Sequence, residues 1–157
     1  MKAVRLPFRM ALVAACAAAC ASLGLTREAR ATLGGDVRSV ELNEQHLGSI
    51  RRVVKLASGE RHDLQLPSGM IVHEYVSPGG AVYAITWRGP RMPDLRELLG
   101  PYFSRLSGRD PGSGHHRVNV TVADLVLRSV GHRGSFSGRA WLPPLVPSSV
   151  HVDADLD

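Results

Sequence analysis

Four segments that alternate apolar and polar residues, joined by very short connections, constrain the fold of this chain more than any other feature. A period of two residues is typical of β-strands. The connections between them, Ser58-Gly59, 67–69 and 77–80, all contain glycine, which suits tight turns with positive φ. Connections this short allow only antiparallel neighbours, so the pattern predicts a β-meander. Its four strands are expected over residues 51–57, 61–66, 70–76 and 81–88.

Two registers are open for the hairpin between the third and fourth expected strands. A two-residue turn at Pro78-Gly79 would pair Glu74 with Tyr83. A three-residue loop with a bulge at Gly80 would instead pair Tyr75 with Tyr83. We favour the second register because it separates large from small side chains. It places Ile71, His73, Tyr75, Tyr83, Ile85 and Trp87 on one face, and Val72, Glu74, Val76, Val82 and Ala84 on the other.

Helical spacing is clear in one segment, residues 93–106, and weak near the start. The apolar stripe has the spacing i, i+3, i+4, i+7, i+8, i+11 and predicts an amphipathic helix on one sheet face. Pro93 suits its first position, Asp94 suits a cap, and Gly100-Pro101 should kink it. Residues 32–50 are expected to form a docked arm with at most one helical turn, because Gly48 interrupts the pattern.

The last third of the chain predicts further strands and an irregular end. Strands are expected over residues 117–122, 125–130 and 139–142, with a Gly- and Ser-rich turn over 131–138. The loop over residues 107–116 is expected to be flexible. Three prolines make residues 143–157 an irregular segment whose acidic end, residues 151–157, should fray.

The first 31 residues have the three parts of an export signal. Lys2, Arg5 and Arg9 precede an Ala-rich apolar run, and Ala29-Arg30-Ala31 offers the small-x-small pattern that a signal peptidase reads. We therefore expect cleavage before Thr32 and an exported, periplasmic or secreted protein. The apolar run is short for a membrane anchor, so no transmembrane span is expected in the mature chain.

A lipoprotein is the alternative for this leader. Val13-Ala14-Ala15-Cys16 resembles a lipobox, in which Cys16 would become the lipidated first residue of an envelope protein. Apart from Cys16 and Cys20, the chain contains no cysteine. A mature protein without cysteine has neither a disulfide framework nor a thiol nucleophile.

Charge argues against a nucleic-acid partner. The whole chain has a formal net charge of +5. Four of these charges belong to residues 1–31, and residues 32–157 contain 14 basic and 13 acidic side chains. This near-neutral balance, with few aromatic residues, predicts no nucleic-acid groove. The histidines have no metal-ligand spacing, so neither a metal site nor another cofactor is expected.

Five residues are candidates for a binding site, although no motif predicts a catalytic residue. Glu74 lies between valines in a central strand, where a carboxylate is costly unless it is paired. Arg88, Arg96 or Arg139 could pair with it, or it could face a ligand. Trp87 would be a binding platform if exposed and core if covered. The candidate binding residues are His73, Glu74, Tyr75, Trp87 and Arg139.

Eight short pieces of the chain carry a family resemblance: 33–35, 66–69, 74–80, 82–87, 89–90, 93–95, 98–103 and 138–143. In this order they resemble an exported proteobacterial family known as domain of unknown function 2844. The resemblance covers residues 33–157 and implies export and a shared fold, but no activity, substrate or catalytic residue. It also leads us to expect arginine where this chain has His73, so that any pairing of this residue with a carboxylate would depend on pH.

These patterns together predict one α+β domain over residues 32–157. The expected fold is an antiparallel sheet of about five to seven strands with one kinked helix packed on it. The function that best fits is a non-enzymatic cell-envelope module that binds a partner protein or a surface component. The alternative is a periplasmic or secreted hydrolase of unrecognised type that uses Glu74, Asp94 or a histidine.

Overall fold

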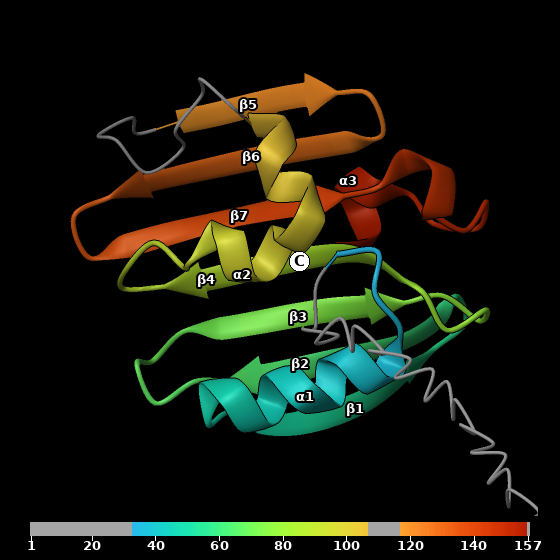
Figure 1. The fold of residues 1–157 in the computed structure, drawn as a ribbon, viewed down its shortest axis with the longest axis horizontal. Helices are drawn as coiled ribbons and strands as arrows, with labels where there is room; N and C mark the ends of the chain where they lie inside the picture. The colour runs from blue at the N-terminus through green and yellow to red at the C-terminus, as the bar shows by residue number, and fades with distance from the viewer. Residues whose placement is uncertain (1–32, 107–116, 157) are drawn as a thin grey trace, which may run out of the picture.

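The computed structural model describes residues 33–106 and 117–156 of the chain. The expected export signal, the alternative lipidation site at Cys16 and the expected flexible loop over residues 107–116 lie outside these residues and stay predictions. The described part is an α+β fold built on one seven-stranded antiparallel sheet with the strand order β1-β2-β3-β4-β7-β6-β5 (Figure 1). The strands are β1 (Ile50–Leu56), β2 (Gly59–Gln65), β3 (Ile71–Val76), β4 (Val82–Gly89), β5 (Arg117–Val122), β6 (Leu125–His132) and β7 (Ser135–Trp141).

The meander β1–β4 is confirmed, but neither expected register of its last hairpin holds along the strands. Val76 pairs with Val82, as in the second register, and a bulge then shifts the pairing so that Tyr75 lies opposite Ala84. The bulge places Tyr83 beside Tyr75, and their ring centroids are 6.1 Å apart. Compared with the second register, the extra residue at the bulge reverses the side of the sheet to which the following β4 side chains point. Ile85 and Trp87 therefore share a face with Glu74, opposite the face of His73.

The prediction that residues 32–50 form an arm with at most one helical turn is wrong over most of its length. Residues Val37–Leu47 form an 11-residue helix, α1. The Asp36 side chain caps this helix by accepting from the Ser39 amide at 3.0 Å. Gly48 ends the helix in a left-handed conformation and does not interrupt it. The buried stripe of α1 contains Ser39 and Asn43 as well as Val40, so its apolar period was hidden in the sequence.

The expected bent helix is confirmed as two segments, α2 (Leu95–Leu99) and the 3-10 helix η1 (Gly100–Leu106). Asp94, not Pro93, begins it, because the Asp94 carboxylate accepts from the amides of Arg96 and Glu97. The change of helix type falls at Gly100-Pro101, since Pro101 has no amide to donate. In Figure 1, α1 lies over β1 and β2, and α2 with η1 lies over the other half of the same sheet face.

The strands β6 and β7 are longer than the sequence predicted, because part of the Gly- and Ser-rich segment expected to be a turn is β-strand. β6 continues to His132 and β7 begins at Ser135, so the expected turn over residues 131–138 shrinks to a tight turn at Arg133-Gly134. β7 then pairs with both β6 and β4, which joins the two halves of the sheet. This β4–β7 pairing connects residues about fifty positions apart in the sequence, and no local pattern predicts it.

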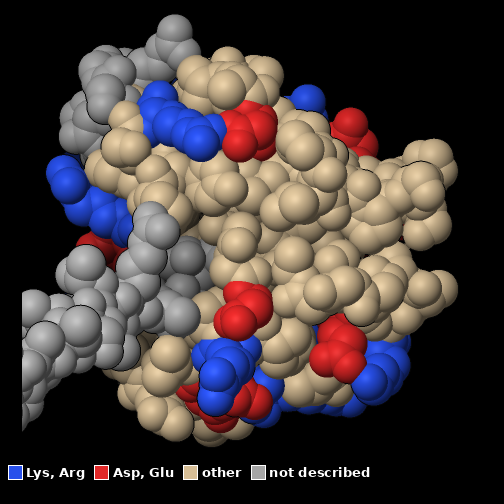
Figure 2. All heavy atoms as spheres, turned by 45° about the vertical axis from the view of Figure 1, so that its right-hand side comes forward, with Lys and Arg blue, Asp and Glu red and all other residues tan. Residues whose placement is uncertain are grey.

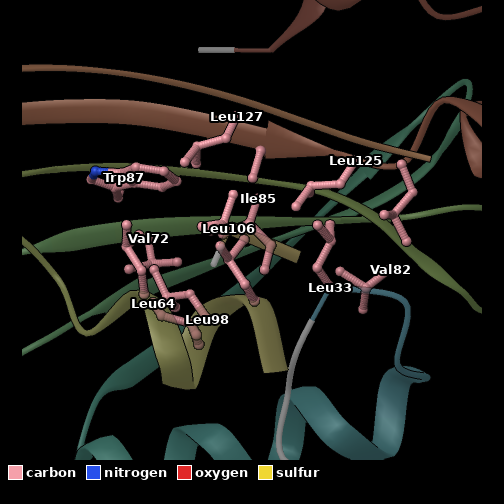
Figure 3. Close-up of a cluster of buried hydrophobic side chains, with 14 of the residues drawn as sticks. Leu33, Leu64, Val72, Val82, Ile85, Trp87, Leu98, Leu106, Leu125 and Leu127 are labelled. Atoms are coloured by element: carbon pink, nitrogen blue, oxygen red, sulfur yellow. The ribbon is translucent and has the colours of Figure 1, made fainter. Parts of the chain in front are cut away.

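The main core lies between the sheet and the helices. Figure 3 shows the Trp87 ring beside Val72 and Leu127, with Leu98 of α2 below. A second cluster, on the opposite face, packs Tyr75, Tyr83 and Trp141 against the C-terminal segment.

The C-terminal segment contains η2 (Pro143–Leu145) and α3 (Val152–Asp155), and its apolar side chains pack in the second cluster, on the face opposite the helices. The expected fraying of residues 151–157 is wrong up to Leu156, whose side chain is buried in the second cluster. None of the helices in the described residues is long and apolar enough to cross a membrane.

Candidate functional site

The sheet face opposite α1 and α2 has polar side chains in register across all seven strands. The cross-strand pairs align one residue from each strand in a row perpendicular to the strands. Side chains in such a row all point to the same side of the sheet. In strand order the row is Arg52, Asp63, His73, Thr86, Arg139, Arg128 and Asn119. A row of polar side chains therefore crosses this face, and such side chains can form hydrogen bonds with water or with a polar ligand.

Four neighbouring strands each place one arginine in an open groove on this side. The groove has a volume of about 610 Å³, and its lining also includes His73, Thr86, Asn119 and Ser137. Arg88 and Arg117 belong to the next row, in which they are three strands apart. We call this surface the arginine face, and it is defined by Arg88 (β4), Arg139 (β7), Arg128 (β6) and Arg117 (β5).

Two of these arginines are held in place by an aromatic ring and an acidic residue. The guanidinium carbons of Arg128 and Arg139 lie 5.2 and 5.7 Å from the centre of the Trp141 ring. Asp153 Oδ1, from α3, accepts from Arg128 Nη1 at 2.9 Å and from Arg139 Nη2 at 2.5 Å. Arg139 Nη1 also donates to the Val152 carbonyl at 3.0 Å. The fold thus already binds one carboxylate here.

The other two arginines, Arg88 and Arg117, are exposed. Arg88 and Arg117 form no ion pair or hydrogen bond with any other residue in the described ranges 33–106 and 117–156. Asp153 pairs with Arg128 and Arg139 only, and Asp63, the other carboxylate of the polar row, is paired with Arg61 and His73. Arg88 and Arg117 therefore add positive charge that no carboxylate of the described residues pairs with. Such an excess of fixed positive charge in a concave surface attracts anions.

Thr86 places an unsatisfied hydroxyl on the floor of the groove. Its side chain is 2% exposed, and Oγ1 has no hydrogen-bond partner among the described residues. Thr86 lies between His73 and Arg139 in the polar row. Because a buried hydroxyl without a partner is costly, a ligand oxygen that accepts from it would recover that cost.

His73, a sequence candidate, faces this groove and pairs with a carboxylate. Its Nδ1 lies 2.6 Å from Asp63 Oδ1, and Arg61 Nε donates to the same oxygen at 2.7 Å. Partial burial raises the pKa of Asp63, but the hydrogen bonds from Arg61 and His73 outweigh it and hold this pKa below its ordinary value. The pairing of residue 73 with a carboxylate is thus present, and its pH dependence stays a prediction.

Glu74, the next residue, lies on the other side of the sheet, beneath α1. Its side chain is fully buried, and Oε1 accepts from Asn43 Nδ2 at 3.1 Å. Burial raises the pKa of Glu74 to about 7, against the lowering effects of the Asn43 hydrogen bond and the Arg51 charge. Among the expected partners, Arg88 and Arg139 line the groove on the other face, and Arg96 lies over the Phe103 ring. Asn43 takes their place as the partner of Glu74.

The five sequence candidates therefore do not form one site. Trp87 is 2% exposed in the main core, and Tyr75 is 1% exposed in the second cluster. His73 and Arg139 share the groove, whereas Glu74 does not reach it. Glu74, His73 and Arg139 do not converge as an arrangement favouring a carboxylate-based enzyme would have them, because Glu74 and His73 are neighbours in a β-strand and point to opposite faces.

Sequence reasoning missed Arg88, Arg117, Arg128 and Thr86 as members of one surface. A signal was available, since each of four strands contains one arginine at a position that faces away from the core. Reading this signal required the order β4-β7-β6-β5, which depends on the non-local pairing of β7 with β4.

The charges on the helix side are arranged differently. In Figure 2 the acidic and basic side chains seen from that side lie next to each other in small groups around an uncharged area. Ion pairs such as Arg51 with Glu44, and Lys55 with Glu60, belong to this mixed pattern.

Within residues 33–106 and 117–156, no three His, Cys, Asp or Glu side chains gather in a way that could hold a metal ion.

Comparison with known proteins gives one family. A family model described as "Protein of unknown function (DUF2844)" matches residues 29–154, which agrees with the resemblance noted in the sequence. No curated protein and no solved structure matches the chain.

Proposed function

Because the chain belongs to the DUF2844 family, whose description assigns no activity, we propose its function from the arginine face: it is a non-enzymatic binding module of the cell envelope that holds an anionic partner there. The observation that carries this proposal is the groove in which Arg88, Arg117, Arg128 and Arg139 converge from four adjacent strands.

The rest of the groove supports binding more than catalysis. Arginine is always protonated, so it orients and neutralises an anion but transfers no proton. The titratable neighbour in the groove, His73, is already paired with Asp63. Arginine side chains with planar donors suit carboxylate and phosphate oxygens, and Thr86 and Asn119 add further hydrogen-bonding groups.

The location in this proposal rests on the leader. The basic start, apolar run and small-x-small end of residues 1–31 support export, with cleavage before Thr32. The alternative processing at Cys16 would leave the same domain attached to a membrane by lipid. In both cases the partner would be an envelope protein or a surface component.

The alternative function, a hydrolase based on Glu74, Asp94 or histidine, has no comparable support. Glu74 is enclosed beneath α1, and Asp94 caps α2 on the helix side of the sheet. No observation brings either carboxylate into the groove with His73.

Binding of the purified protein to immobilised polyanions tests this proposal. The probes are dextran sulfate, polygalacturonate and poly-L-glutamate, at about 0.15 M salt so that weak long-range attraction is screened. We expect at least one probe to bind, and Arg88→Ala combined with Arg117→Ala to weaken that binding at least about tenfold.

A matched control removes the same charge elsewhere. Arg38→Ala with Arg91→Ala lowers the net charge by the same amount at exposed positions outside the groove and should leave binding within about twofold. Equal loss in both double variants, or no binding to any polyanion, would overturn the proposal. Recovery of the protein only in the cytoplasmic fraction would contradict its envelope location.

A further inference from the structure

The C-terminal segment places one carboxylate and one main-chain carbonyl on the arginine face. Asp153 presents its carboxylate to Arg128 and Arg139 at once, and the preceding carbonyl, of Val152, accepts from Arg139. The two arginines therefore contact one acidic side chain and one main-chain oxygen of the same segment. A separate acidic peptide offers the same two kinds of acceptor, a side-chain carboxylate and a main-chain carbonyl.

We infer that the partner on the arginine face is an acidic peptide segment of another protein, for which this chain's Asp153 stands in at one end of the groove. This inference rests on the proposed function and names the chemistry of the ligand.

The remaining part of the groove fits additional acidic residues of the same peptide. Arg88 and Arg117 lie in one row, three strands apart, and neighbouring strands are about 4.8 Å apart, so their backbones are separated by about 14 Å. An extended peptide advances about 3.3 Å per residue, and every second side chain points the same way. Acidic residues at positions i, i+2 and i+4 would therefore span the distance from Arg88 to Arg117.

The Asp153 contact is suited to exchange with such a ligand. The Asp153 side chain is 73% exposed, and exposed ion pairs contribute little stability. The α3 segment is anchored next to it by the buried Leu156, so it can release the two arginines without leaving the sheet. The Trp141 ring, stacked against both guanidinium groups, keeps them in place for the next carboxylate.

Peptide is favoured over nucleic acid because of the aromatic residues. Proteins that bind single-stranded nucleic acids stack the bases on exposed aromatic rings. On this side of the sheet Tyr75, Tyr83 and Trp141 are each at most 7% exposed, so they offer no such platform.

Fluorescence anisotropy with labelled peptides on the full chain tests the inference. The probe is a nine-residue peptide of alternating glutamate and serine, and its control replaces each glutamate by glutamine. We expect the glutamate peptide to bind at least about tenfold more tightly than the glutamine peptide, and Arg88→Ala with Arg117→Ala to abolish this difference.

Asp153→Asn provides the second test. Removing the negative charge of Asp153 should tighten peptide binding several-fold, because a ligand carboxylate then no longer competes with an intramolecular one for Arg128 and Arg139. The bond from Arg139 to the Val152 carbonyl is kept in this variant. Unchanged or weaker binding in Asp153→Asn would contradict the role of Asp153 as a stand-in. Thermal unfolding of the variant checks that its fold is kept.

Other anions separate this inference from the proposed function. The same protein is tested with a single-stranded thymidine oligonucleotide, polygalacturonate and phosphatidylglycerol vesicles. Groove-dependent binding to any of these, without binding to the glutamate peptide, overturns the peptide inference and leaves the proposed function standing. Binding to none of the probes, the peptide included, overturns both.

Discussion

Asn43 of α1 donates a hydrogen bond of 3.1 Å to Glu74 of β3, and both side chains are almost completely buried. His62, opposite Glu74 on β2, is also buried, and its pKa is lowered, chiefly by burial. The second oxygen of Glu74, Oε2, has no partner among the described residues. α1 is thus docked on the sheet through a polar contact in which the carboxyl group is more stable when protonated.

Replacing Glu74 by glutamine should stabilise the protein at neutral and alkaline pH. The folded-state pKa of about 7 lies above the ordinary value of 4.5, so the folded protein holds a proton that the unfolded chain has lost. Stability therefore falls as pH rises between these two values. The cost above pH 7 is at most about 3 kcal/mol, and glutamine avoids it. Urea unfolding of both proteins at pH 4 and pH 8 measures the difference.

A matched control for Glu74→Gln is Glu41→Gln, which changes the same group at an exposed position of α1. It should alter stability by no more than about 0.5 kcal/mol at either pH. A Glu74→Gln protein that is no more stable than the native one at pH 8 would show that the buried carboxyl is not strained there.

Asn43→Ala should destabilise the protein by about 1–3 kcal/mol, because Glu74 then loses its neutral hydrogen-bond donor inside the core. The loss should be larger at pH 8 than at pH 5, since an ionised carboxylate without a donor is the more costly form. Thermal unfolding at both pH values measures it. Leu42→Ala, at an exposed position of the same helix, is the control, and equal losses in the two variants would argue against the contact.

Asp63→Asn should lower stability by about 1 kcal/mol near pH 6, because it weakens the bonds from Arg61 and His73. The pKa of Asp63 is held below 3.8, so this contribution is present above that pH and is lost as the pH falls below it. The difference between variant and native protein should accordingly shrink on acidification in a denaturant series. A difference that stays constant down to pH 2 would contradict this assignment.

Gly138→Ala should cost about 1–3 kcal/mol through overpacking. A Cβ atom at Gly138 would lie 2.3 Å from Cζ2 of Trp87 and 2.8 Å from the carbonyl oxygen of Arg128. The Trp87 ring needs the space that this glycine leaves on the neighbouring strand. Gly79→Ala serves as the control, because its nearest neighbour would be 3.8 Å away. Similar melting temperatures for Gly138→Ala and the native protein would contradict the close contact.

The elements that the sequence predicted correctly depend on interactions between near neighbours. The meander follows from alternation and short glycine turns, and the bent helix follows from its apolar stripe with Asp94 before it and Gly100-Pro101 within it. The strand over residues 117–122 was predicted with its observed bounds for the same reason. Each of these signals lies within a few residues of the element it predicts.

Only the tertiary structure decided which residues meet. A single bulge at Tyr83 set the register between β3 and β4. In this register the Glu74 side chain lies on the core side of the sheet and the His73 side chain faces the groove. The helix α1 was hidden because its buried stripe is partly polar, and Asn43 belongs there only once Glu74 lies beneath it. The arginine face required β7 to pair with β4, and the free energy of that pairing comes from long-range packing that no local pattern of residues encodes.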